Sequence, residues 1–471
     1  MADIVLTGGG ICGLSTAMLL AKDGHQVTVL ERDPAPPPES PDEAWVSWER
    51  RGVNQFRLPH FFLARFRILL ERELPEVVVA LERAGALRIN PIAEAPDFVT
   101  GGPMEGDEQF ESITGRRPVM EAAIAGVAAV TPGVTVRRGV GAAGLITNGS
   151  AAAGVPHVVG VTTGEGEEIR ADLVVDATGR RSPLPGWLDA IGAPPPDEQL
   201  DDSGFIYYGR TFRSRDGSLP AALGPPLQHY DSLSILALPA DNGTWALALI
   251  TSAGDSALRA LRDIDTWTTA LGSYPLVAHW LEGEPFEPEI KVMAKIEDRY
   301  RRFVVDGAPV ATGVVPVGDS WACTNPSVGR GASIGLIHGV ALRDLVRSGP
   351  LDDPVAFATA WDEATESSVA PWYRETLWMD HHRLGEIDAS IQGRAYEPDD
   401  PKYELAKALA AGGAGGPDVL RAFVRNAGLL AALDDVIDEL GPDRLLSAGG
   451  GWREAPPLGP SREELEKLVG L

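Results

Sequence analysis

A glycine-rich turn between a short apolar segment and a helical segment constrains the N-terminal fold more than any other feature of this sequence. Residues 4–7, "IVLT", have the composition of a buried parallel strand, and they lead directly into "GGGICG" at 8–13. A helical pattern follows over 14–24, and "HQVTVLERD" at 25–33 predicts a second strand. The order of strand, glycine turn, helix and strand predicts a dinucleotide-binding unit built on a parallel sheet.

Each residue of this unit has a distinct expected task. Gly8 permits the tight turn, Gly10 lets a pyrophosphate approach the backbone, and Gly13 lets the helix pack closely against the strand. The helix N-terminus offers N–H groups and a positive dipole to phosphate. Glu31 can accept hydrogen bonds from a ribose, and its negative charge favours FAD or NAD over NADP. We also expect its neighbour Arg32 to contact the cofactor.

Composition excludes several other classes of protein. The chain has 471 residues, of which 44% are hydrophobic, enough for two or three domains. Its two cysteines, Cys12 and Cys323, are far apart, which argues against a disulfide framework or a zinc site and favours the cytoplasm. A net charge of −26 without a basic run argues against a nucleic-acid partner. We find neither a signal peptide nor a membrane anchor, and expect a soluble protein.

Two later segments resemble further parts of a nucleotide site. After Glu31 the loop "PAPPPESPDEA" interrupts the alternation of strand and helix that a nicotinamide dehydrogenase would continue. A buried-strand run at 173–175 precedes "DATG" at 176–179, and an apolar strand over 310–317 ends in Gly318-Asp319. The expected cofactor site is therefore assembled from distant segments.

The sequence resembles the single-component FAD monooxygenases of the para-hydroxybenzoate hydroxylase fold. The subgroup that it resembles most contains bacterial polyether-type epoxidases and, more distantly, squalene epoxidase. The motifs that carry the resemblance are the glycine fingerprint with Glu31, "RRGVNQFRLPH" at 50–60, "GRRPVMEAAI" at 115–124, "DLVVDATGRRSPLPGWL" at 172–188 and "PVGDSWACTNPSVGRGASIG" at 316–335.

The resemblance implies roles for individual residues around FAD. Arg117 would approach the cofactor, Gly179 would pack behind its adenosine end, and Asp319 would hold a ribityl hydroxyl. The loop around Asn325-Pro326 would face the isoalloxazine ring, and a helix over 332–346 would point its N-terminus at the ring. His60 lies where the family keeps a histidine near the flavin, and a purely structural role is equally compatible. The expected cofactor-binding residues are Gly8, Gly10, Gly13, Glu31, Arg32, Arg117, Gly179, Gly318, Asp319, Pro326, Gly329, Arg330 and Gly331.

We therefore expect an α/β fold of the glutathione reductase type 2 class, with an FAD-binding Rossmann-like domain, an antiparallel substrate-binding sheet and a helical C-terminal region. The FAD domain would be discontinuous, over 1–85, 105–190 and 295–348. The substrate domain would comprise 86–104 and 191–294, and a helical cap would span 349–471.

The resemblance implies oxygen insertion through a flavin C4a-hydroperoxide, with NAD(P)H as a transient electron donor. The substrate would be an apolar small molecule that is epoxidised or hydroxylated in specialised metabolism. An alternative is a flavin-dependent reductase or dehydrogenase of an isoprenoid-like alkene. Less favoured are a non-catalytic flavoprotein and a halogenase, because halogenases need a lysine after the fingerprint and none occurs between Lys22 and Lys291.

Oxygen insertion needs an apolar wall that orients substrate and excludes water. The sequence predicts an antiparallel sheet that could provide this wall. Its strands are expected over 203–213, 232–240 and 244–252. For each single candidate, a place in the core of the sheet is favoured over contact with the substrate. The candidates are Phe205, Tyr207, Ile235, Trp245 and Leu247.

Other constellations have simpler explanations. "GASIG" at 331–335 has the spacing of a nucleophile elbow, but Ser333 lies well past the strand end and inside a helix. Asp380-His381-His382 with Glu386 suggests a metal cluster, but only His382 and Glu386 share a helix face, so we expect no metal site. The helical C-terminal region could cover the substrate site through Trp372 or Trp378, or form a dimer surface; monomer and homodimer both stay open.

Overall fold

A five-stranded parallel sheet forms the centre of the N-terminal half. The computed structural model describes residues 1–53, 55–152, 154–349, 351–454 and 458–470. The strand order is β20-β9-β1-β2-β5, with the neighbours of β1 in parallel register. The strands span Asp3–Thr7 (β1), Gln26–Glu31 (β2), Val134–Arg138 (β5), Leu173–Asp176 (β9) and Val314–Pro316 (β20). The predicted strand over 310–317 is therefore shorter than expected.

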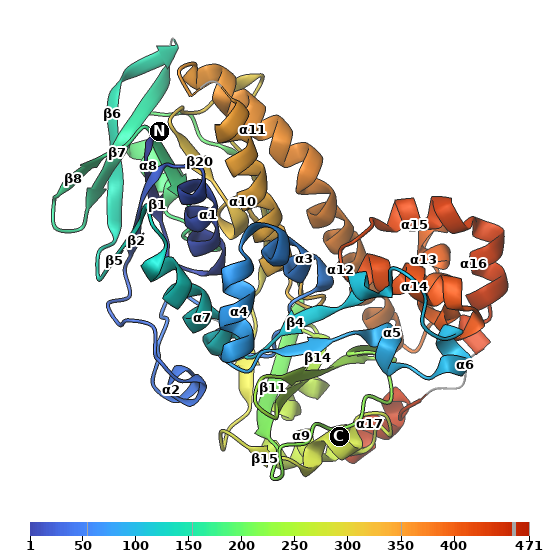
Figure 1. Cartoon of the computed structure of the whole chain (residues 1–471). Helices are drawn as coiled ribbons and strands as arrows, with labels where there is room; N and C mark the ends of the chain where they lie inside the picture. Colours follow the sequence, from blue (N-terminus) through green and yellow to red (C-terminus); the bar gives the residue numbers. More distant parts are fainter. Residues whose placement is uncertain (54, 153, 350, 455–457, 471) are drawn as a thin grey trace.

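Both faces of this sheet are buried, which explains its apolar strands. Ile4 and Leu6 pack against helices on one face, whereas Val5 packs in a separate core on the other. The covering helices are α1 (Ile11–Lys22), α7 (Arg117–Val130) and α10 (Gly331–Ser348), with α3 (Ala64–Glu73), α4 (Pro75–Arg83) and α11 (Pro354–Ser368) packed beside them (Figure 1). The helix predicted over 332–346 is thus present as α10.

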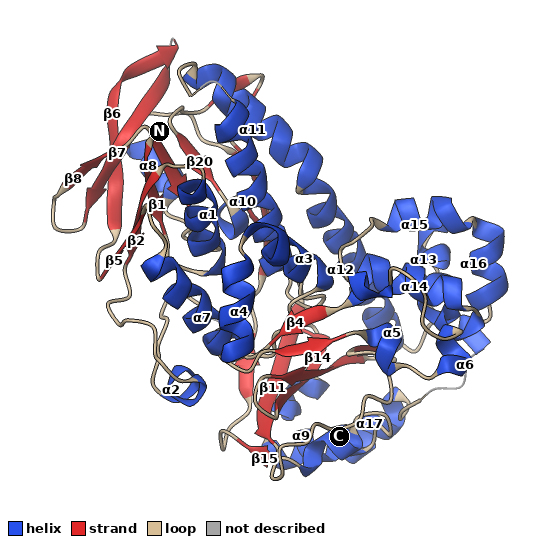
Figure 2. Cartoon of the chain, in the orientation of Figure 1, coloured by secondary structure: helices blue, strands red, loops and turns tan. Residues whose placement is uncertain are grey.

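The opposite face is covered by a small antiparallel sheet that the sequence analysis did not identify. It has the order β6-β7-β8, and its strands span Ala142–Ala152, Val155–Thr163 and Glu168–Arg170. Val158 and Val161 of β7 pack against Val5 and Val174 of the parallel sheet, together with α8 (Leu184–Ala190). Figure 2 shows this sheet at the outer edge of the molecule.

The three strands predicted in the middle region form a second antiparallel sheet. Its order is β12-β13-β14-β11-β15, with β16 also paired to β11. One face packs on α9 (Ile264–Gly272) around the buried Trp267. The strands span Phe205–Arg213 (β11), Leu227–His229 (β12), Leu233–Ala240 (β13), Thr244–Ser252 (β14), Glu284–Pro285 (β15) and Lys291–Met293 (β16).

Shorter strands and helices connect the two large sheets. A three-stranded sheet joins β10, β17 and β21, and a two-stranded antiparallel sheet pairs β3 with β4. These strands span Asp197–Asp202 (β10), Glu297–Arg302 (β17), Ala322–Cys323 (β21), Leu87–Ile89 (β3) and Ser112–Thr114 (β4). The short helices are α2 (Pro41–Val46), α5 (Pro91–Glu94) and α6 (Asp97–Thr100).

The C-terminal region is helical, as predicted. The 22-residue helix α12 (Ala370–Ile391) runs from α11 toward a cluster of helices with its own apolar core (Figure 1). Ser461 and Glu464 form a capping box at the start of the last helix. Among the described residues, no helix is long and apolar enough to cross a bilayer. The cluster contains α13 (Pro401–Ala411), α14 (Pro417–Ala427), α15 (Leu433–Leu440) and α16 (Pro442–Gly449), and α17 (Arg462–Leu468) packs on α9.

Candidate functional site

A cavity of about 2240 Å³ extends from the parallel sheet past the antiparallel sheet to the C-terminal helices. Pockets for one small molecule typically have roughly 300–1,000 Å³, so this cavity has room for a dinucleotide cofactor and a second ligand. All thirteen residues predicted to bind the cofactor line it, as does His60. The structure therefore brings together residues from four distant segments of the chain.

The glycine turn leaves the N-terminus of α1 open to the cavity. Gly8 has a φ of +101°, and a Cβ on it would lie 2.4 Å from the carbonyl oxygen of Ala177. A Cβ on Gly13 would lie 2.0 Å from the carbonyl oxygen of Gly8. A Cβ on Gly10, by contrast, would meet no described atom within 4 Å and would project into open space. Gly10 is also an N-cap without a side-chain hydrogen bond in the described chain, so free N–H groups face this space.

The carboxylate of Glu31 is held by an ion cluster that sequence reasoning missed. Its Oε2 accepts hydrogen bonds from the Gly9 N–H (2.9 Å) and from Arg50 (2.7 Å), and its Oε1 accepts from the Asp33 N–H (2.8 Å). Arg50 is buried and also pairs with Asp33 and Glu121. A carboxylate offers about four lone-pair positions, so Glu31 retains one for a ribose hydroxyl. Arg50 lies in the "RRGVNQFRLPH" motif, but nothing in the sequence indicated its partners.

His60 and Arg117 form a second pair on the cavity wall. The Nδ1–H of His60 donates to the Leu58 carbonyl (2.9 Å), so its Nε2 accepts from Arg117 (3.2 Å). Burial and the neighbouring guanidinium lower the pKa of His60 to about 3. The Nε of Arg117 donates to Glu121 (2.7 Å). His60 is therefore neutral. Arg117 is held between His60 and Glu121 and lines the cavity.

Two turns from different strands meet beside the fingerprint. Asp176, at the end of β9, accepts hydrogen bonds from Thr7 and from the backbone and side chain of Thr178. The Gly318 N–H donates to Nδ1 of the buried His338 (3.1 Å), whose pKa burial lowers to about 3. Burial also raises the pKa of Asp319, which lines the cavity. These contacts fix the Gly318-Asp319 turn against the sheet, and no sequence motif indicated His338.

Asn325 in the predicted ring-facing loop is fixed from three sides. Its Oδ1 accepts from the Tyr207 hydroxyl (2.5 Å), and its backbone N–H donates to Asp298 (2.7 Å). Its Nδ2 donates to Asp380 of α12 (3.0 Å), which also accepts from Ser327 (3.2 Å). Burial raises the pKa of Asp298 to about 6 and that of Asp380 to about 7. The loop is thus tied to both the antiparallel sheet and the C-terminal region.

Arg330 lines the cavity, but its guanidinium is directed to α12. It pairs with the buried Glu375 (2.6 Å) and donates to Thr376 (3.1 Å). The backbone of Arg330 is the N-cap of α10, and no side chain in the described ranges caps that helix. The contribution of this residue to a ligand would therefore come from the helix N-terminus rather than from its charge.

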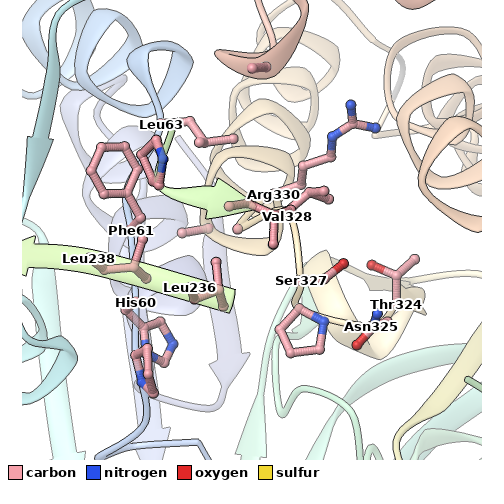
Figure 3. A pocket seen from close by; sticks show the side chains of 18 of the residues that line it. His60, Phe61, Leu63, Leu236, Leu238, Thr324, Asn325, Ser327, Val328 and Arg330 are labelled. Carbon is pink, nitrogen blue, oxygen red and sulfur yellow. The ribbon is translucent and has the colours of Figure 1, made fainter. Parts of the chain in front are cut away.

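An apolar wall faces this loop across the cavity. Figure 3 shows His60, Phe61 and Leu63 on one side, Leu236 and Leu238 on β13, and the loop from Thr324 to Arg330 opposite. Phe61 packs with Leu236 and Leu238 in one apolar cluster. The space between this wall and the loop could hold a flat ring and an apolar molecule beside it.

The five predicted substrate residues are buried in two apolar clusters, one of which includes the wall residues Leu236 and Leu238. None of the five is among the described residues that line the cavity. Ile235, Trp245 and Leu247 lie in the core between the sheet and α9, whereas Phe205 and Tyr207 are buried in the same apolar cluster as Leu236 and Leu238. Ile235 lies on the opposite face of β13 from Leu236 and Leu238, since successive side chains point to opposite faces of a strand. Because both faces of β13 are apolar, the sequence shows no alternation of polar and apolar residues that would indicate which face meets the cavity.

The remaining candidates lie in structural surroundings. Ser333 is the third residue of α10 and is fully buried, unlike a nucleophile on an exposed turn. His382 contacts Tyr396 and Asp400, whereas Glu386 pairs with Arg383 and Lys407. In the described part of the chain no group of three metal-ligating side chains occurs. Trp378 lines the cavity, but Trp372 packs in an apolar core.

The residues present fit FAD. Open helix N-termini and Arg117 suit a diphosphate, Glu31 and Asp319 suit sugar hydroxyls, and the loop suits a flat ring. The fold is an FAD-binding α/β fold of the kind found in flavoprotein monooxygenases, with a parallel sheet, an antiparallel sheet and a helical C-terminal region.

Comparisons with known proteins agree with this class. Residues 3–45 match the family model of the FAD dependent oxidoreductases. The chain is 27% identical over 403 residues to Protein Rv3254 of Mycobacterium tuberculosis, an alignment that covers 81% of this chain and 80% of that protein. It is similar in structure to the anhydrotetracycline hydroxylase OxyS of Streptomyces rimosus, with a TM-score of 0.54, 17% identity, and coverage of 92% of this chain and 76% of that one.

A flavin-dependent brominase is also similar in structure. A triple mutant of Bmp2 gives a TM-score of 0.58 at 15% identity, with 93% of this chain and 99% of that chain covered. A hydroxylase and a brominase therefore share this architecture. At such identities the likeness establishes the fold and leaves the reaction to be inferred from the site.

Proposed function

We propose that this protein is an FAD-dependent monooxygenase that takes electrons from NAD(P)H and hydroxylates or epoxidises a largely apolar small molecule. The observation that carries the proposal is the continuity of the cavity. The predicted cofactor residues and the apolar wall of Phe61, Leu236 and Leu238 line the same space. Bound reduced FAD would supply the chemistry by activating dioxygen.

The chain itself would bind, orient and exclude water. The N–H groups at the start of α1 and Arg117 would hold the diphosphate, and the remaining lone pair of Glu31 would hold a ribose hydroxyl. Neutral His60 holds no proton at Nε2, because that nitrogen accepts from Arg117. The apolar wall would orient the substrate against the loop around Asn325.

The charge of the cavity supports an anionic cofactor. The whole chain carries 41 basic and 67 acidic residues. Within the cavity lining the ratio is reversed, with eleven basic and eight acidic side chains. A dinucleotide diphosphate would be repelled by the protein as a whole and attracted by this lining.

Isotopic labelling distinguishes the proposed reaction from its alternatives. A library of apolar aromatic and alkene compounds is screened for stimulation of NADH or NADPH consumption, and each active compound is turned over under ¹⁸O₂. A monooxygenase places one ¹⁸O atom in the product and shows no turnover without oxygen. Anaerobic turnover with an unlabelled product would instead establish the reductase alternative.

Bromide provides a second comparison, because a brominase shares the fold. The same reactions are repeated with added bromide, and the products are analysed by mass spectrometry. The proposal predicts an oxygenated product with and without bromide. A brominated product that forms only with bromide would contradict the proposed monooxygenase reaction and establish halogenation.

A further inference from the structure

The cavity continues beyond the apolar wall to an end built from the C-terminal helices, which we call its helical end. Aromatic side chains line this end, with Tyr403 and Trp452 6.1 Å apart between ring centres and Tyr396 and Tyr403 5.4 Å apart. Trp378 adds a further ring. An aromatic lining of this kind suits a flat or elongated apolar molecule.

Basic side chains are more frequent at the helical end than in the protein as a whole. Four basic side chains and three acidic side chains line it, in a chain of net charge −26. Arg453 pairs with Glu404, so attraction of an anion depends on basic groups that keep unused donors. The basic residues are Arg383, Arg394, Lys407 and Arg453, and the acidic residues are Asp231, Glu386 and Glu397.

Most of the charge near α12 is already committed to protein contacts. Arg383 donates to the carbonyls of Tyr230 (2.6 Å) and Leu233 (2.7 Å) and pairs with Glu386 (2.7 Å). The other oxygen of Glu386 accepts from the Tyr403 hydroxyl (2.7 Å). Against the effect of burial, Lys407 and Arg383 lower the pKa of Glu386 to about 2, so it stays ionised. Arg383 and Glu386 therefore neutralise each other and leave no strong donor for a ligand.

Lys407 is different, because its ammonium group retains donors. One N–H bonds to Glu386 (2.8 Å), and among the described residues this is its one hydrogen-bond partner. Its Nζ lies 4.9 Å from the ring centre of Trp452 and 5.9 Å from that of Tyr403. An ammonium has three donors, so two are available beside an aromatic wall.

We propose that the helical end binds the carboxylate of an elongated, aromatic or otherwise apolar carboxylic acid, and that Lys407 determines this specificity. The inference rests on the proposed function, since it names the substrate class of the same cavity. The carboxylate accepts hydrogen bonds from Lys407, and the apolar body of the acid lies along the aromatic rings toward the wall of Leu236 and Leu238.

A pair of isosteric probes tests the preference for an anion. 1-Naphthaleneacetate and 1-naphthaleneacetamide share a ring system and differ in charge at the end of the side chain. Binding of each to the FAD-saturated protein is measured by isothermal titration calorimetry. We expect the acid to bind at least tenfold more tightly than the amide in the wild type, and within about twofold of the amide in Lys407→Gln.

Two variants separate the ligand contact from a structural role of Lys407. Lys407→Arg keeps the charge and should retain the preference for the acid. Lys402→Gln is the matched control: Lys402 lies on the same helix, 5.1 Å from the Trp378 ring centre and paired with Asp434, but is not among the described lining residues. It should leave both affinities unchanged.

Three results would overturn the inference. They are equal binding of the two probes in the wild type, no detectable binding of either probe at millimolar concentration, and an acid preference that survives Lys407→Gln. A failure of the proposed function would be detected separately, in the ¹⁸O₂ experiment, because these titrations involve no oxygen chemistry. A Lys407-dependent acid preference together with unlabelled product would keep the subsite and reject the monooxygenase reaction.

Discussion

At the scale of single residues, buried acids hold the parts of the cavity in place. Asp380 is the most informative, because it joins α12 to the loop through Asn325 and Ser327. Its second oxygen, Oδ2, has no partner among the described residues. Burial and the nearby Asp298 raise its pKa to about 7, and Arg330 opposes that rise. A buried carboxylate without full hydrogen bonding is costly when ionised.

Asp380→Asn should therefore change how stability depends on pH. The usual pKa of an aspartate is about 3.9, so between roughly pH 4 and 7 the folded state holds a proton that the unfolded state releases. The free energy of unfolding of the wild type consequently falls as pH rises through this window. Asparagine does not titrate, so between pH 4.5 and 8 the free energy of unfolding of the variant should rise relative to that of the wild type by about 3 kcal/mol.

Urea unfolding at several pH values measures this difference. Asp298 titrates in both proteins and contributes with the same sign, so the comparison of the two profiles isolates the titration of Asp380 together with its coupling to Asp298. Parallel pH profiles for the wild type and Asp380→Asn would show that Asp380 is ionised in the fold throughout.

Asp319 permits a direct test of the expected sugar contact. Asp319→Ala should weaken FAD binding by about ten- to a hundredfold, because a hydrogen bond to a charged group contributes roughly 1.5–3 kcal/mol. Flavin fluorescence titration measures the affinity. Asp189→Ala is a control, since Asp189 is exposed on α8 and lies outside the described cavity lining. Equal loss in the two variants would remove Asp319 from the site.

At the scale of elements, the strand, turn and helix of the fingerprint perform two separable tasks. Gly13 lies where α1 meets the turn, and a Cβ there would collide with the backbone. Gly10 lies where the turn meets the cavity, and a Cβ there would collide with nothing in the described protein. One glycine therefore serves the fold, and the other keeps space for a ligand.

A matched pair of alanine substitutions separates these tasks. Gly13→Ala should lower the free energy of unfolding of the apoprotein by about 1–3 kcal/mol, as expected for overpacking. Gly10→Ala should leave that value within about 0.5 kcal/mol but weaken FAD binding at least tenfold, since its Cβ would enter the expected path of the diphosphate. Thermal unfolding and flavin titration of both variants provide the measurements. Intact FAD binding in Gly10→Ala would contradict the assigned role of Gly10.

The elements also show which parts of the site the sequence could predict. The fingerprint was predictable because strand, turn, helix and acid are adjacent in the chain. The wall was not, because Ile235 and Leu236 are both buried and differ only in the face of β13 that they occupy. The ion cluster around Arg50 was also missed, since its partners lie 17 to 71 residues away and each is an ordinary acid.

At the scale of the whole molecule, the account depends on distant segments that meet at one cavity. The fingerprint, the segment around His60 and Arg117, the turn after β9 and the loop before α10 contribute to a single lining. An acidic chain surrounds a cavity lined by an excess of basic residues. The C-terminal helices complete the far end, so cofactor and substrate would share one continuous space.

Flavin uptake by the purified protein tests this central claim most directly. The protein is expressed, purified and titrated with FAD while its visible spectrum is recorded. We predict a yellow protein that carries or takes up one FAD per chain and releases it on heating. A colourless, folded protein that releases no FAD and takes up none at micromolar concentration would contradict the account.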